Sequence, residues 1–288
     1  MLSNTIDFQF SEVFNGNRDC YSHFYFFIIQ TVFKYRSVRD LDMTPFWIAL
    51  QFLTVLPIEL KTMPTAQQNG RAILFYPLVG LIIGGILFLI TCLFAKLPIL
   101  LLAAIIMTLW IWLTGGLHLD GLADTADAWV GGFGDKLRTL QIMKDPSCGP
   151  IGVLSLVLIC LLKFALVYVL IEQHQTLFLI LVPALGRLVP SILFLTTPYV
   201  REKGLGRSLT DHLPKTASCI ITGLVLLLPL YWGWQGLIAV IGFLISLVYL
   251  RHLFIKRIDG ITGDTVGAAI ELSEIVLLFA FVVSYFYL

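Results

Sequence analysis

The sequence predicts an all-α fold, a polytopic integral membrane bundle of about seven transmembrane helices. Hydrophobic residues make up 58% of the 288 residues and charged residues only 13%, whereas soluble domains are about 25% charged. The mean hydropathy is +0.90. The apolar runs are roughly 18 to 25 residues long, enough for a helix to cross a hydrocarbon core of about 30 Å. We therefore expect lipid to be the main solvent of this chain.

Seven apolar segments are the expected spans. They cover residues 72–94, 97–114, 149–171, 176–200, 217–233, 235–250 and 275–288, and the ends of the last two are the least well defined. The earlier segment 44–57 is too short to cross a bilayer comfortably, so it is expected to be re-entrant or interfacial.

Residues 1–42 precede the first recognisable motif. They are aromatic and mixed in charge and contain no small-residue cleavage site of a signal peptide. Since Met43 directly precedes that motif, we expect residues 1–42 to be an upstream-start artefact or a dispensable extension. Residues 43–288 are predicted to form a single membrane-embedded domain.

Lysine and arginine are distributed unevenly between the two sides of the expected bundle. Of the nineteen, sixteen lie on the side of the N-terminus, Lys96 lies on the other side, and Lys163 and Arg187 fall within spans. Because short cytoplasmic connections collect Lys and Arg, segments 115–148, 201–216 and 251–270 are expected in the cytoplasm and the C-terminus outside. Lys163 is mid-span, so we expect it to be buried in the bundle beside an acid.

The segment Gly115–Asp127 contains the most informative polar pattern. Asp120, Asp124 and Asp127 are spaced i, i+4 and i+7, which places them on one face of a helix. Carboxylates this close repel one another unless they stay hydrated, take up protons or share a cation, and a hard divalent metal is the simplest resident. Each acid alone is equally well explained as a helix cap or a solvated charge.

Further polar motifs follow on the same side of the bundle. Lys144 and Asp145 lead into Gly149 and Gly152, which permit the close backbone approach of a phosphate-binding turn. Arg187 lies within a span, where an arginine usually faces a polar cavity that holds an anion.

A second acidic pair occurs near the last span. Asp264 and Glu271 are seven residues apart and share a helical face, while Arg201 belongs to the motif Pro198–Arg207. Asp264 can act as a catalytic acid or merely cap the helix. His118, two residues before Asp120, is equally consistent with a structural role and with a substrate contact.

These motifs together resemble one family. Four motifs resemble the series of cobalamin synthase, the adenosylcobinamide-GDP ribazoletransferase family. They are His118-Leu-Asp-Gly-Leu-Ala-Asp-Thr-Ala-Asp127, Met143-Lys-Asp145 with Gly149 and Gly152, Pro198-Tyr199 with Arg201 and Gly204-Leu-Gly206, and Thr262-Gly-Asp-Thr-Val-Gly-Ala268 with Glu271. Phe52–Pro57 and Arg71–Gly80 resemble its opening. The likeness extends over about residues 44–288, and the chain departs from it in the N-terminal extension and in Pro146, Cys148 and Pro150.

The resemblance implies a Mg²⁺-dependent phosphotransferase of the bacterial inner membrane whose active site faces the cytoplasm. The 3′-hydroxyl of α-ribazole, or of its 5′-phosphate, would attack the phosphorus attached to cobinamide, and GMP would leave. The implied catalytic residues are Asp120, Asp124, Asp127 and Asp264, of which the first three hold Mg²⁺, and the implied substrate-binding residues are His118, Lys144, Asp145, Arg187, Arg201 and Glu271. Which acid is the general base is left open, as is the preferred form of ribazole.

Two other functions fit parts of the sequence. A CDP-alcohol phosphotransferase of lipid synthesis also uses an Asp-Gly-rich helix, but its signature has Ala-Arg after the Asp-Gly, and here Ala123 is followed by Asp124. An ion or metal transporter would need polar groups at the bilayer midplane, whereas these acids cluster near the ends of spans. No nucleic-acid partner is expected, and a homo-oligomer remains one option.

Overall fold

Helices make up most of the described chain, which comprises residues 43–60, 62–202 and 205–288 of a computed structural model. The expectation for residues 1–42 lies outside the described residues. The described helices are α3 (Thr44–Leu53), α4 (Ala66–Ala72), η1 (Ile73–Phe75), α5 (Tyr76–Leu93), α6 (Ile99–Leu113), α7 (Leu117–Gly131), α8 (Lys136–Ile142), α9 (Pro150–Glu172), α10 (Phe178–Gly186), α11 (Leu188–Thr196), α12 (Leu205–Asp211), α13 (Lys215–Leu227), η2 (Leu228–Trp232), α14 (Trp234–Ile258) and α15 (Gly263–Tyr287).

The predicted membrane bundle is confirmed. Within the described residues, six helical segments are long and apolar enough to cross a membrane, and the pair α6 and α7 makes a seventh if its two bent parts count as one span. The segment expected to be re-entrant or interfacial forms only the 10-residue helix α3. Each expected span has a helix at its position, so hydropathy located the spans well.

Much of the segment 251–270, which is expected in the cytoplasm, is helical. Helix α14 continues to Ile258 and α15 already begins at Gly263, so only a short turn separates them. The last turns of α14 are basic, and two of their arginines bind neighbouring helices. Arg251 donates to the Thr196 carbonyl, 2.7 Å away, at the end of α11. Arg257 donates to the Trp129 carbonyl at the end of α7.

Local sequence accounts for the helix ends near the polar motifs. Thr262 caps α15 in a capping box with Thr265, and Asp135 caps α8 by accepting from the Arg138 amide. The break between α10 and α11 falls at Arg187. Pro190 has no N–H to donate to the carbonyl of the residue four positions earlier, which weakens the helix at this point.

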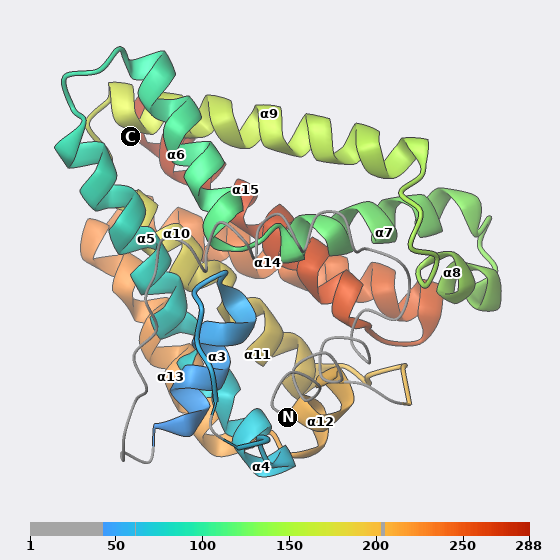
Figure 1. The fold of residues 1–288 in the computed structure, drawn as a ribbon. Helices are drawn as coiled ribbons and strands as arrows, with labels where there is room; N and C mark the ends of the chain where they lie inside the picture. The colour runs from blue at the N-terminus through green and yellow to red at the C-terminus, as the bar shows by residue number, and fades with distance from the viewer. Residues whose placement is uncertain (1–42, 61, 203–204) are drawn as a thin grey trace, which may run out of the picture.

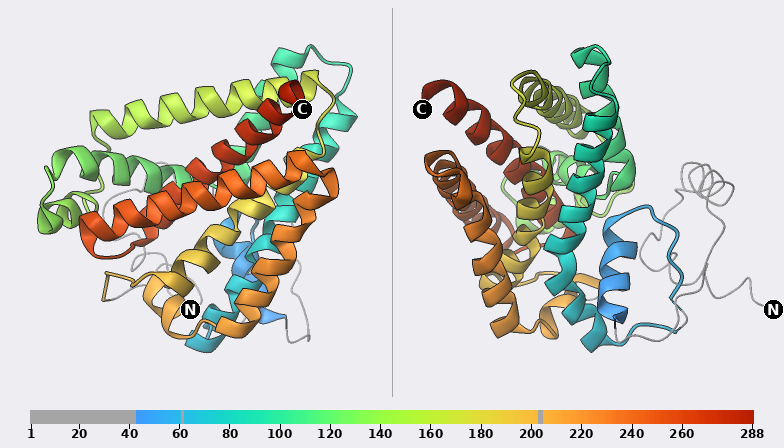
Figure 2. Two further views of the ribbon diagram at one scale, coloured as in Figure 1. Left: turned by 180° about the vertical axis from the view of Figure 1, so that it is seen from behind. Right: turned by 90° about the vertical axis from the view of Figure 1, so that its left-hand side faces the viewer.

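The helices diverge from one end of the molecule to the other (Figures 1 and 2). The α5–α6 connection, the end of α9 and the C-terminus lie together at one end, where Figure 1 marks C. At the other end the helices separate into two groups, one with α4, α12 and the start of α13, the other with α7, α8 and the starts of α9 and α15. Most of the predicted site residues belong to the second group.

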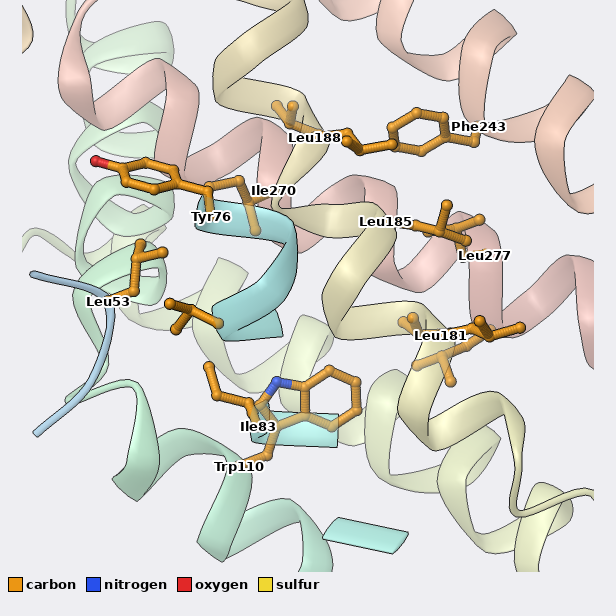
Figure 3. Packing of buried hydrophobic residues seen from close by; sticks show 14 of the residues in the cluster. Leu53, Tyr76, Ile83, Trp110, Leu181, Leu185, Leu188, Phe243, Ile270 and Leu277 are labelled. Carbon is orange, nitrogen blue, oxygen red and sulfur yellow. The ribbon is translucent and has the colours of Figure 1, made fainter. Parts of the chain in front are cut away.

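The buried core joins these groups. Figure 3 shows Trp110 of α6, Ile83 of α5, Leu185 of α10, Phe243 of α14 and Leu277 of α15 within one cluster. Helices α5 and α10 can approach closely because Gly80 of α5 has no side chain; a Cβ there would lie only 2.5 Å from the Pro183 carbonyl oxygen. Small residues permit this approach in membrane bundles, where packing rather than the hydrophobic effect drives association.

Candidate active site

A sharp bend presents the acidic helix α7. Gly115 and Gly116 have φ values of 60° and 68°, a conformation that favours glycine, and they separate α6 from α7 at an angle of 85°. Asp120, Asp124 and Asp127 all lie on α7 and are half-buried. The predicted sharing of one helical face therefore holds for these three acids.

Asp127 has a specific partner that sequence analysis missed. Its two carboxylate oxygens accept hydrogen bonds from the Gly149 amide at 2.7 Å and the Gly152 amide at 2.8 Å. These amides belong to the N-terminus of α9, where backbone donors lack helical partners and a negative charge is favourable. A Cβ at Gly152 would lie 2.4 Å from this carboxylate. The glycines predicted to approach a phosphate thus approach a side-chain carboxylate.

Asp120 lies near the point where α7 and α15 cross. A Cβ at Gly121 would be 2.8 Å from the Asp264 carbonyl oxygen, and one at Gly267 would be 3.3 Å from the His118 backbone. The contact of Gly121 with the Asp264 backbone places Asp120, one residue earlier on α7, near the start of α15. The glycine crossing therefore brings acids from two separate motifs into one site.

Asp264 pairs with Arg201. The Arg201 guanidinium donates to the Asp264 carboxylate and reaches the Met143 carbonyl at 3.5 Å. Arg201 is held there by the preceding residues, because Val200 donates to the Ile261 carbonyl at 2.9 Å. Since Thr262 caps α15, the interpretation of Asp264 as that cap is wrong. Asp264 is instead the anionic partner of Arg201.

The neighbouring Tyr199 lies near the start of α15, where a Cβ at Gly263 would be 3.9 Å from its hydroxyl. Burial raises the pKa of its hydroxyl, with the Asp264 charge adding to the rise and Arg201 opposing it. A Cβ at Gly206 would lie 2.3 Å from that hydroxyl. The glycine of the Gly204-Leu-Gly206 motif thus makes room for Tyr199 beside the Arg201–Asp264 pair.

The connection between α8 and α9 completes the site. Lys144 and Asp145 are exposed, and the Ser147 amide, which donates to Asp145 at 2.9 Å, lowers the pKa of that carboxyl. The pKa of the Cys148 thiol is raised by partial burial and then by the charges of Asp127, Asp124 and Asp120. A Cβ at Gly152 would lie 3.0 Å from the Cys148 sulfur and 2.4 Å from the Asp127 carboxylate, so this turn meets the acidic face of α7.

Three predicted substrate ligands, His118, Arg187 and Glu271, lie together inside the bundle. Arg187 and Glu271 are buried and belong to an ion-pair network with Lys163 and Glu274, and His118 Nδ1 lies 4.0 Å from Glu271. The expected burial of Lys163 beside an acid is confirmed. Glu274 was not predicted, although two cations inside spans indicate that two buried anions should balance them.

The described residues contain no preformed group of three His, Cys, Asp or Glu side chains that could hold a metal ion. The Mg²⁺ ligand set therefore stays a prediction. Mg²⁺ usually keeps several waters and binds through one or two carboxylates plus substrate phosphates, so the oxygen donors of α7 fit its chemistry without a complete protein cage.

The fold and site together define a polytopic helical membrane protein with acidic and basic groups gathered at one end of the bundle. The chain belongs to the cobalamin-5-phosphate synthase family, whose sequence model matches residues 45–282. A protein of Acinetobacter baumannii named adenosylcobinamide-GDP ribazoletransferase is 90% identical over 246 residues, covering 85% of this chain and all of the relative. A Pseudomonas fluorescens protein of the same name is 52% identical over 237 residues, covering 82% and 98%. No solved structure matches.

Proposed function

We propose that this chain joins adenosylcobinamide-GDP to α-ribazole or its 5′-phosphate and releases GMP. Family membership and the names of its relatives support this reaction. The observation that carries the proposal is the convergence at the α7–α15 crossing, where Gly121 of α7 packs against the Asp264 backbone and brings Asp120 near the Arg201–Asp264 pair. Phosphoryl transfer needs such positioning and charge neutralisation more than it needs covalent chemistry.

The proposed reaction is a substitution at phosphorus. The ribazole 3′-oxygen forms a bond to the phosphorus carried by cobinamide, the bond from that phosphorus to the GMP oxygen breaks, and the hydroxyl proton passes to a carboxylate of the site. Arg201 and Lys144 offset phosphate charge. Arg201 is half-buried and held in place, whereas Lys144 is exposed, so Arg201 is the better positioned of the two.

Asp120 and Asp124, both half-buried on α7, belong to the proposed set of Mg²⁺ ligands. Asp127 belongs to the predicted set as well, and its carboxylate has about four acceptor positions, of which the α9 amides take two. When bound, the ion would supply positive charge beside the pyrophosphate. The chain itself orients the carboxylates and holds the basic groups.

We place the protein in a bacterial inner membrane with this site facing the cytoplasm. The site shares its end of the bundle with α8, which carries Lys136 and Arg138. Arg257 binds Thr139 of α8 and Arg201 binds Asp264, and basic connections remain on the cytoplasmic side. Nucleotide substrates are available in that compartment.

One assay tests the reaction. Membranes that contain the protein are incubated with adenosylcobinamide-GDP, α-ribazole and Mg²⁺, and GMP and the corrinoid product are measured. We expect both products in equal amounts, and none from membranes that carry Asp124→Asn. Transfer from a CDP-activated lipid instead, or Mg²⁺ uptake without GMP release, would contradict the proposal.

A further inference from the structure

The network of Lys163, Arg187, Glu271 and Glu274 lies inside the bundle and outside the site described above. Lys163 Nζ donates to Glu271 at 2.9 Å and also to Glu274, and Arg187 donates to Glu274. All four side chains are at most 6% exposed. The two cations balance the two anions, which is the arrangement that makes burial of charge tolerable.

The network connects helices that are far apart in sequence. Lys163 comes from α9, Arg187 from the break between α10 and α11, and both glutamates from α15. The Lys163 ammonium also lies 4.1 Å from the centre of the Trp110 ring of α6. The network therefore ties α15 to α9 and to the α10–α11 break, and it ties α9 to α6.

Helix α9 holds both helices of the active site. Its N-terminal amides bind Asp127 of α7, and Lys163 binds α15. The third contact is the glycine crossing, where α7 and α15 touch backbone to backbone. These three contacts form a closed triangle of α7, α9 and α15, which Figure 1 shows as neighbours. A change in the position of α15 along α9 must move Asp264 relative to Asp120.

We propose that Lys163 is a positioning residue, which sets the register of α15 against α7 through Glu271 and Glu274 and thereby places Asp264 beside Asp120. This inference rests on the proposed function. It gives Glu271 a structural partner in place of substrate. Seven residues of helix separate Glu271 from Asp264, about 10 Å along the axis, so an error at the network is carried rigidly to the site.

The test uses a charge-balanced variant of the full-length protein. Lys163→Met alone leaves two carboxylates facing one arginine and is expected to reduce the amount of folded protein. Lys163→Met/Glu271→Gln restores neutrality because Arg187 still pairs with Glu274. We expect this double variant to accumulate in the membrane. Its kcat should fall by about 10- to 100-fold, as a displacement approaching 1 Å would cause.

The KM values for both substrates should stay within about threefold of wild type, because no substrate contact is removed. Lys136→Met is the matched control. It breaks the pair of Lys136 with Asp259, whose side chains are 41% and 74% exposed, and should leave kcat unchanged.

Each outcome decides the proposal. A wild-type kcat in the double variant would overturn it and leave the network a role in stability alone, and a raised KM at unchanged kcat would show that Glu271 contacts substrate. If the double variant does not accumulate, Glu271→Gln is measured instead. An unchanged kcat then overturns the proposal, and a raised KM at unchanged kcat shows that Glu271 contacts substrate. No turnover in the wild-type protein would overturn the proposed function and this inference with it, whereas a fully active double variant overturns only the inference.

Discussion

Replacing Gly121 by alanine should damage the site without removing any functional group. The added Cβ would lie 2.8 Å from the Asp264 carbonyl oxygen and 3.0 Å from its Cα, both backbone atoms of a helix. Ordinary contact begins at 3.4 Å, so α15 must retreat by about 0.6 Å. Overpacking of this kind costs about 1–3 kcal/mol, offset by the roughly 0.5–1 kcal/mol that alanine gains over glycine within a helix.

The displacement matters more for catalysis than for stability. Since misplacement by about 1 Å lowers rates by about 10²-fold, a shift of this size predicts roughly a tenfold loss of kcat. Turnover per folded protein and the thermal unfolding temperature are measured side by side in detergent. KM should change little, because the substrate-binding side chains are retained.

Gly85→Ala provides the control, because a Cβ at this helical position of α5 meets nothing within 4 Å. It should unfold at an equal or higher temperature and keep full turnover. Wild-type turnover in Gly121→Ala, at normal abundance, would refute the reasoning that the glycine crossing sets the distance between Asp120 and Asp264. Equal losses in both variants would show that the effect is not specific to the crossing.

Four further predictions concern the site, the N-terminal extension and the orientation in the membrane. Asp264→Asn should lower turnover by about 10²-fold, since it removes an acid that pairs with Arg201 and does not cap α15; turnover near normal would exclude a catalytic role. In a variant that keeps Cys148 as its only cysteine, Mg²⁺ should speed alkylation of the thiol at pH 8, because a cation beside Asp120, Asp124 and Asp127 lowers the thiol pKa that burial and these acids raise. Asp124→Asn should speed alkylation in the absence of Mg²⁺ and weaken the effect of the ion. An identical alkylation rate with and without Mg²⁺ would count against the metal site. Starting the chain at Met43 should leave turnover unchanged, because the family match begins at residue 45, and lost turnover at normal abundance would show that residues 1–42 contribute. A reporter fused after Leu288 should be active only outside the cytoplasm, given the asymmetry of Lys and Arg, and cytoplasmic activity would reverse the proposed orientation.

The sequence by itself determined the membrane bundle, the positions of its spans and the helix that carries Asp120, Asp124 and Asp127. These features depend on local hydropathy and helical periodicity, which are readable within a window of one helix. It also placed Lys163 and Arg187 inside spans, and the high cost of a lone charge in lipid is sufficient to predict that each is paired.

Only the tertiary structure decided the partners of these charges. Glu274 lies 111 residues from Lys163 along the chain, and Asp127 meets the start of α9 across a 22-residue connection to Gly149. The local sequence does not distinguish a glycine turn that binds a side-chain carboxylate from one that binds a phosphate, because both place backbone amides around a negative charge. From the sequence, the arginines at the end of α14 could be assigned only to the cytoplasmic side. They donate to carbonyls of α7 and α11, and such contacts exist only once the helices have packed.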